Sequence, residues 1–75
     1  MYKDKKVMIL GLARSGIASA KLLLRDNAKL ILCDSKDNDT IRQNLQGLDL
    51  KDATVLLGVD PVNYLKDIDT LVISP

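Results

Sequence analysis

Histidine, glutamate, tryptophan and phenylalanine are absent from this 75-residue chain, so all ten acidic residues are aspartates. Without histidine, the chain cannot form the nucleophile–base pairs that hydrolases build from serine or cysteine with histidine. Its single cysteine, Cys33, excludes an intrachain disulfide and a cysteine cluster for zinc. Because Cys33 ends an apolar run, we expect it to be a small buried hydrophobic residue. The composition favours a stretch that binds a ligand, with no catalytic residues of its own.

The chain also lacks a strong net charge and long apolar runs. Eleven lysines and arginines against ten acids give a formal net charge of +1, which provides no basic footprint for nucleic acid. No apolar run reaches the roughly 18 residues that a membrane-spanning helix needs. The polar residues 3–6 run directly into an apolar segment, which is not the pattern of a signal peptide. We therefore expect a cytoplasmic protein that binds neither nucleic acid nor a membrane.

The main functional signal is a glycine-bounded turn that follows an apolar run. Val7–Leu10 is typical of a strand buried on both faces of a parallel sheet, and Gly11–Gly16 follows it as G-x-A-x-x-G. In the related G-x-G-x-x-G motif, the first glycine allows the tight turn and the last allows close packing of helix and strand. N–H groups at the start of that helix face an anion. The pattern predicts a ligand with phosphate groups; a tight strand–helix connection without a ligand is the alternative.

Two further residues narrow the choice of ligand. Asp34 follows a second apolar run, Leu30–Cys33, at about the 20-residue spacing at which the motif places an acid for a ribose or base. An aspartate in this position can instead cap the turn after the strand. The β-carbon of Ala13, where the motif has glycine, would push a pyrophosphate outward. This disfavours a nicotinamide dinucleotide without excluding it.

Strand and helix patterns alternate along the chain, which predicts right-handed crossovers and a doubly wound parallel sheet. The first helix has an apolar face of small and aliphatic residues, and Asn27 is expected to end it in a left-handed conformation. The predicted strands are Val7–Leu10, Leu30–Cys33, Thr54–Leu57 and Thr70–Ile73. The first predicted helix runs from about Arg14 to Asp26. The second is short: it follows the polar cluster 34–40, carries Ile41, Leu45 and Leu48 at helical spacing, and stops near Gly47. A third, of one or two turns, follows Asp60-Pro61.

The predicted fold class is α/β, a Rossmann-like parallel sheet of about four strands with flanking helices. In the strand order 3-2-1-4, the first and fourth strands are neighbours. The turn Gly11–Gly16 and Ser74 would then face each other across a ligand crevice, with Asp34 on the same rim. Because the sequence stops at this crevice, we interpret residues 1–75 as one incomplete N-terminal domain of a longer protein.

Three segments together resemble the beginning of a Mur ligase: Lys6–Gly16, Asp34–Lys36 and Leu71–Pro75. The resemblance covers essentially the whole chain, and the G-L-x-x-S-G turn is one of its two most telling features. The other is Ser74-Pro75, which resembles the start of a Ser-Pro-Gly turn near the substrate. In this family, the first of three domains has a fold like that of dinucleotide-binding proteins but binds a UDP-sugar.

The resemblance implies roles for individual residues. The backbone N–H groups of Arg14 and Ser15 would meet the diphosphate of the UDP-sugar. Asp34 and Ser35 would hydrogen-bond to the uracil edge, and Lys36 would lie along the uracil face, where family members often carry the better-stacking arginine. The substrate-binding residues predicted in this way are Gly11, Arg14, Ser15, Gly16, Asp34, Ser35, Lys36 and Ser74.

The resemblance also implies a reaction for the longer protein. It would be an ATP-dependent amide-bond ligase of peptidoglycan synthesis that adds D-glutamate to UDP-N-acetylmuramoyl-L-alanine. ATP, Mg²⁺ and D-glutamate would bind to domains outside these residues, which would hold no metal or cofactor themselves. The alternative is a nicotinamide-dinucleotide-binding module of a dehydrogenase or of a regulatory subunit. A G-K-[ST] phosphate loop downstream of Pro75 would favour the ligase.

Overall fold

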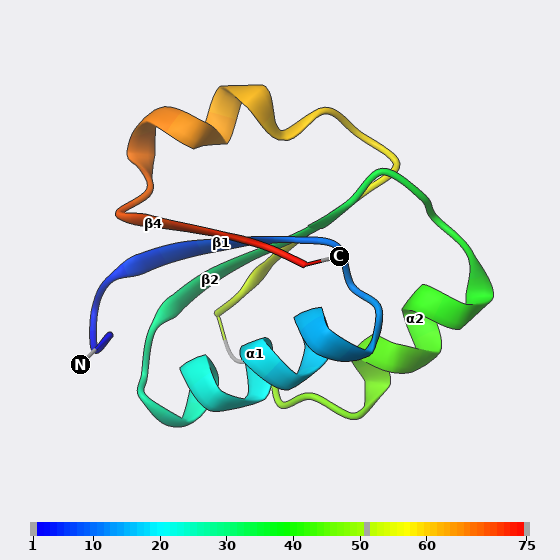
Figure 1. The fold of residues 1–75 in the computed structure, drawn as a ribbon, viewed down its shortest axis with the longest axis horizontal. Coiled ribbons are helices and arrows are strands. Elements are labelled where there is room, and N and C mark those ends of the chain that lie inside the picture. The colour runs from blue at the N-terminus through cyan, green and yellow to red at the C-terminus, as the bar shows by residue number, and fades with distance from the viewer. Residues whose placement is uncertain (1, 51, 75) are drawn as a thin grey trace.

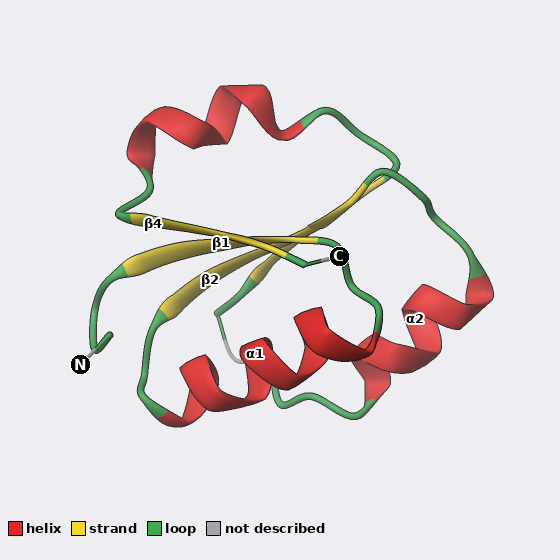
Figure 2. Ribbon diagram, viewed as in Figure 1, coloured by secondary structure: helices red, strands yellow, loops and turns green. Residues whose placement is uncertain are grey.

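The computed structural model describes residues 2–50 and 52–74. Four parallel strands form its sheet in the order β3-β2-β1-β4: β1 (Lys6–Leu10), β2 (Lys29–Asp34), β3 (Thr54–Leu57) and β4 (Thr70–Ile73). Helices α1 (Arg14–Arg25) and α2 (Asp39–Gln46) lie on one face of this sheet. The 3₁₀ helix η1 (Pro61–Asp67) lies on the other face, as Figure 1 and Figure 2 show. The predicted α/β fold and strand order are confirmed.

The predicted bounds of β3 and β4 agree with the structure, whereas β1 and β2 are longer than predicted. Strand β1 begins at Lys6, which pairs with Lys29 of β2, and Asp34 at the other end of β2 pairs with Leu57. Polar residues can continue the backbone ladder at a strand end because their side chains reach solvent there. An apolar-run criterion alone therefore places these strand ends too far inward.

Helix α1 buries the face that its sequence pattern predicts, which consists of Gly16, Ile17, Ala20, Leu23 and Leu24. The helix ends at Arg25, one residue before the predicted end. Asn27 then adopts φ 59°, the left-handed conformation expected of a helix stop, and its N–H donates to the carbonyl of Leu24 at 3.1 Å. The chain is thereby turned back into β2.

The two shorter helices are capped by side chains. The Asn38 side chain accepts a hydrogen bond from the Ile41 N–H at 2.9 Å at the start of α2, and Asp60 accepts one from the Val62 N–H at 3.0 Å at the start of η1. Leu48, which the sequence pattern assigns to the second helix, instead follows its end and packs partly buried against the core. No residue of η1 is buried, so this segment lacks the packed apolar face that would stabilise an α-helix.

The core lies between the sheet and helices α1 and α2. Val7 and Ile9 of β1 and Leu30 and Leu32 of β2 point into it and are buried. Met8 and Cys33, outside this cluster, are also buried, which confirms the expectation for the single cysteine. The described residues include no helix with the length and apolar character needed to cross a membrane.

Candidate functional site

The carboxyl end of β1 runs into the glycine turn, and backbone contacts hold its first residue. Gly11 has φ 98°, which favours glycine, and its N–H donates to the carbonyl of Cys33 at 2.8 Å. A β-carbon on Gly11 would lie 3.0 Å from the carbonyl oxygen of Ser74. The first glycine is therefore required both by its conformation and by the close approach of the residue that follows β4.

Gly16 lets α1 begin directly against this turn, since a β-carbon there would lie only 1.9 Å from the carbonyl oxygen of Gly11. Ala13 is the N-cap residue of α1, and it offers no side-chain cap. The first turn of α1 contains no acidic residue. Within the described ranges, no side-chain carboxylate therefore caps the N–H groups of Arg14 and Ser15. An exposed helix start of this kind attracts anions.

Asp34 connects the end of β2 to the glycine turn. Its Oδ2 accepts a hydrogen bond from the Leu12 N–H at 2.9 Å, and its Oδ1 accepts one from the Lys36 N–H at 2.9 Å. The second bond confirms that Asp34 caps the turn after its strand. Each carboxylate oxygen can accept a further hydrogen bond, so this structural role leaves acceptor positions for a ligand. The binding role of Asp34 stays a prediction.

Ser74 lies beside the start of α1, as the strand order predicts. Its N–H donates to the carbonyl of Leu10 at 2.8 Å, and its hydroxyl is hydrogen-bonded to the hydroxyl of Ser15. Segments from opposite ends of the chain thus meet at the glycine turn. Pro75, which belongs to the same predicted motif, lies outside the described residues.

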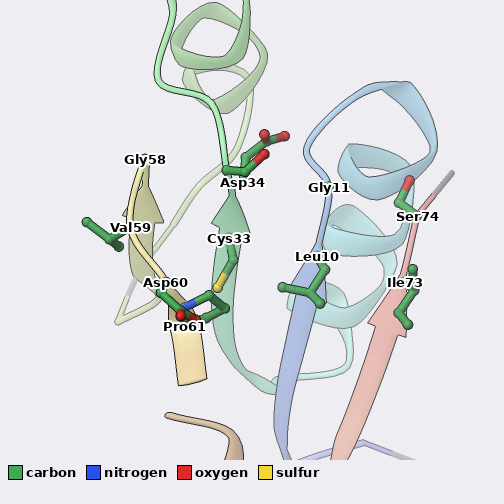
Figure 3. Close-up of a pocket in the computed structure, with 11 residues that line it drawn as sticks. Leu10, Gly11, Cys33, Asp34, Gly58, Val59, Asp60, Pro61, Ile73 and Ser74 are labelled. Atoms are coloured by element: carbon green, nitrogen blue, oxygen red, sulfur yellow. The ribbon is translucent and has the colours of Figure 1, made fainter. Parts of the chain in front are cut away.

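A hollow of about 610 Å³ opens at the carboxyl ends of the strands. Figure 3 shows Leu10, Cys33 and Ile73 in it, from three strands, with Asp34 and Ser74 at its rim. These three apolar residues share one row of the sheet register, on the face away from α1. Its full lining is Leu10, Gly11, Cys33, Asp34, Ser35, Gly58, Val59, Asp60, Pro61, Ile73 and Ser74.

The predicted site residues do not all line this hollow. Gly11, Asp34, Ser35 and Ser74 do, whereas Lys36 lines a second hollow of about 370 Å³ between the glycine turn and α2. Asp34 lines both hollows. The other predicted residues, Arg14, Ser15 and Gly16, line neither hollow and lie at the start of α1.

The chemistry of these side chains suits binding. Burial raises the pKa of the Cys33 thiol, which keeps it protonated and unsuited to act as a nucleophile. In the parts of the chain that the structure describes, no cluster of three acidic, cysteine or histidine residues could hold a metal ion. Near α2, the Arg42 guanidinium hydrogen-bonds to the exposed Asp37 carboxylate and lowers its pKa.

Asn44 of α2 belongs to the site but not to the residues that the sequence patterns predict. Its Nδ2 donates to the carbonyl of Leu12 in the glycine turn at 3.1 Å, and Asn44 also lines the second hollow. Helical spacing places Asn44 one turn after the buried Ile41, so it could be expected beside the buried face. Its partner could not be predicted, because that depends on where α2 packs.

Residues 5–75 match the family described as Mur ligase MurD-like, N-terminal domain. The chain belongs to this family. The resemblance inferred from the glycine turn, Asp34–Lys36 and the end of β4 is thereby confirmed. The MurD-like match covers the whole sheet and every residue predicted to bind substrate.

Several curated relatives of this MurD-like chain are named UDP-N-acetylmuramoylalanine–D-glutamate ligase. The protein of this name from Koribacter versatilis is 40% identical over 73 residues, and the one from Clostridioides difficile is 39% identical over 74 residues. The protein from Lactobacillus helveticus is 40% identical over 76 residues. These alignments cover 97%, 97% and 99% of the chain, but the chain spans only 16% of the length of each relative.

Proposed function

We propose that this chain is the N-terminal, UDP-binding part of a longer cytoplasmic enzyme that ligates D-glutamate to UDP-N-acetylmuramoyl-L-alanine with ATP. The name shared by the relatives supports the reaction, and their greater length leaves room for the domains that would carry it out. The described residues supply no cluster for a metal ion. As the resemblance to Mur ligases implies, we propose that the Mg²⁺ and ATP of this reaction are held by residues elsewhere in the enzyme.

The observation that carries this proposal is the uncapped start of α1 beside the glycine turn. A diphosphate there would accept hydrogen bonds from the N–H groups of Arg14 and Ser15, and it would interact favourably with the helix dipole. Both residues are exposed, and the contacts of Gly11 and Gly16 bring the turn and the helix start together. The hydroxyls of Ser15 and Ser74, which bond to each other, lie at the same place and would add polar partners.

The uridine would extend from this turn toward the end of β2. The free lone pairs of the Asp34 carboxylate would accept a hydrogen bond from the uracil N–H, with Ser35 beside it. Lys36, which is exposed, would lie along the uracil face. A nicotinamide-binding module is no longer favoured, because the chain belongs to a ligase family and has Ala13 in the turn.

Calorimetric titration of the full-length protein tests the ligand class. We expect UDP to bind more tightly than uridine, because only UDP carries the phosphates that the start of α1 would hold. NADH is the comparison ligand, and its binding in the absence of UDP binding would contradict the proposal. The reaction itself is tested by D-glutamate-dependent phosphate release from ATP, which a preparation of residues 1–75 alone should not show.

A further inference from the structure

The backbone of Leu12 is held on both sides by side chains from two other elements. Its N–H donates to Oδ2 of Asp34 at the end of β2 at 2.9 Å, and its carbonyl accepts from Nδ2 of Asn44 on α2 at 3.1 Å. The Leu12 side chain is completely buried, which fixes the residue from a third direction. Two successive peptide groups of the glycine turn are thus fixed, although neither belongs to a helix or strand.

The bond from Asn44 has a consequence on the other side of the same peptide group. In a trans peptide, the carbonyl and the N–H point in opposite directions. Since the Leu12 carbonyl points to Asn44, the N–H of Ala13 points away from α2. Within residues 2–50 and 52–74, this N–H has no hydrogen-bond acceptor. A carbonyl that accepts a hydrogen bond also polarises the N–H of its own peptide group and makes it a better donor.

We propose that Asn44 is a positioning residue for the phosphate-binding turn. Its side-chain amide holds the Leu12–Ala13 peptide group so that the Ala13 N–H joins those of Arg14 and Ser15 as a donor to a phosphate of the ligand. This role rests on the proposed function, since it requires a ligand with phosphate groups at the turn. Asn44 itself does not touch the phosphate; it acts through Leu12.

Asparagine suits this role, and the neighbouring positions supply a control. Aspartate at position 44 would have nearly the same shape, but it would have no donor and would set a negative charge against the Leu12 carbonyl. Helix α2 does not depend on this one bond, because Ile41 and Leu45 anchor it in the core and Asn38 caps it. Gln43, the residue of α2 just before Asn44, carries the same amide group but is exposed.

The test compares Asn44→Asp and Asn44→Ala with Gln43→Ala in the full-length protein. Affinity is measured for UDP and for uridine, which lacks phosphate, and Tm is recorded for each variant. We expect both Asn44 variants to bind UDP about 3- to 10-fold more weakly, the loss expected for one hydrogen bond. Their affinity for uridine should stay at the wild-type value, and Gln43→Ala should change neither affinity.

Each other outcome overturns a defined claim. Unchanged UDP affinity in Asn44→Asp would show that the bond to Leu12 does not position the turn. Equal losses for UDP and uridine, accompanied by a lower Tm, would show that Asn44 only stabilises the fold. A wild-type protein that binds uridine and UDP equally, or binds neither, would overturn the proposed phosphate site, and the role of Asn44 with it.

Discussion

The carbonyl oxygen of Gly11 occupies the space that a side chain on Gly16 would need, with an ideal β-carbon only 1.9 Å away. Gly11 is confined in turn by Ser74, whose carbonyl oxygen would lie 3.0 Å from a β-carbon on Gly11. Three segments therefore meet at backbone distance around the start of α1. The form of the proposed phosphate site depends on the absence of these two side chains.

Gly16→Ala should therefore destabilise the chain strongly. Backbone atoms cannot yield as a flexible side chain can, so we expect a loss of about 3 kcal/mol or more in the free energy of unfolding. Gly47→Ala is the matched control, because Gly47 has φ −78° and a β-carbon there would be 4.0 Å from the carbonyl oxygen of Asn44. It should stabilise the chain by about 0.4–1 kcal/mol. Urea unfolding of both variants measures the difference, and equal effects would show that α1 can move away from the turn.

Patterns within short segments predicted the fold well, because apolar runs, turn residues and helical spacing act locally. The roles of Gly11 and Gly16 followed from the spacing of the glycine motif, and that of Asn27 from its tolerance of the left-handed conformation. The strand order followed from the alternation of strands and helices. The hydrogen bonds that join different elements could not be predicted in this way. The bonds that Asp34 and Asn44 make to Leu12 span 22 and 32 residues of sequence. They depend on how β2 and α2 pack, which no local pattern of residues encodes.

Asp34→Asn tests the two roles of this carboxylate together. The amide has one oxygen where the carboxylate has two, so it cannot accept from both the Leu12 and the Lys36 N–H groups. We expect a loss of about 1–2 kcal/mol in stability. If the carboxylate also binds uridine, KM for the proposed UDP substrate should rise about 10-fold or more. In the proposed reaction the uridine would lie far from the transferred phosphate, so kcat should be nearly unchanged.

Asp37→Asn is the control for that experiment, since Asp37 lies three residues after Asp34, in the loop between β2 and α2, and bonds to Arg42. It should leave KM at the wild-type value. If Asp34→Asn lowers the stability without changing KM, Asp34 has only the capping role that the structure already shows, and the predicted binding role is wrong.

Cys33 should resist alkylation while the protein is folded. Its side chain is only 2% exposed, so a reagent can hardly reach it. Burial also raises the pKa of its thiol, so little of the reactive thiolate is present. At about pH 8, iodoacetamide should modify it far more slowly than it modifies the urea-unfolded chain. The modified fraction, followed by mass spectrometry, should rise along the unfolding curve. Rapid labelling of the native protein would mean that the floor of the larger hollow opens to solvent.

The Asp37–Arg42 pair gives a prediction about acid stability. Hydrogen bonding to Arg42 lowers the pKa of Asp37 in the folded protein, with Nε–Oδ1 at 2.7 Å and the second guanidinium bond at 2.8 Å. Because the folded pKa is depressed, the pair's contribution is present above the unfolded value of about 3.9 and is lost as pH falls through the folded value. Both side chains are largely exposed, at 61% for Arg42 and 39% for Asp37, so this contribution should be small and weakened by salt.

The measurement is the difference in Tm between the wild type and Asp37→Asn from about pH 7 down to about pH 2. The wild type should be slightly more stable at neutral pH, and the two curves should converge in acid, since protonated Asp37 no longer pairs as an anion with Arg42. Arg42→Gln should show the same small loss at neutral pH, because it removes the other partner. A difference that stays constant over the whole range would assign the effect of Asp37→Asn to local packing before α2, and the ion pair would then contribute nothing to stability.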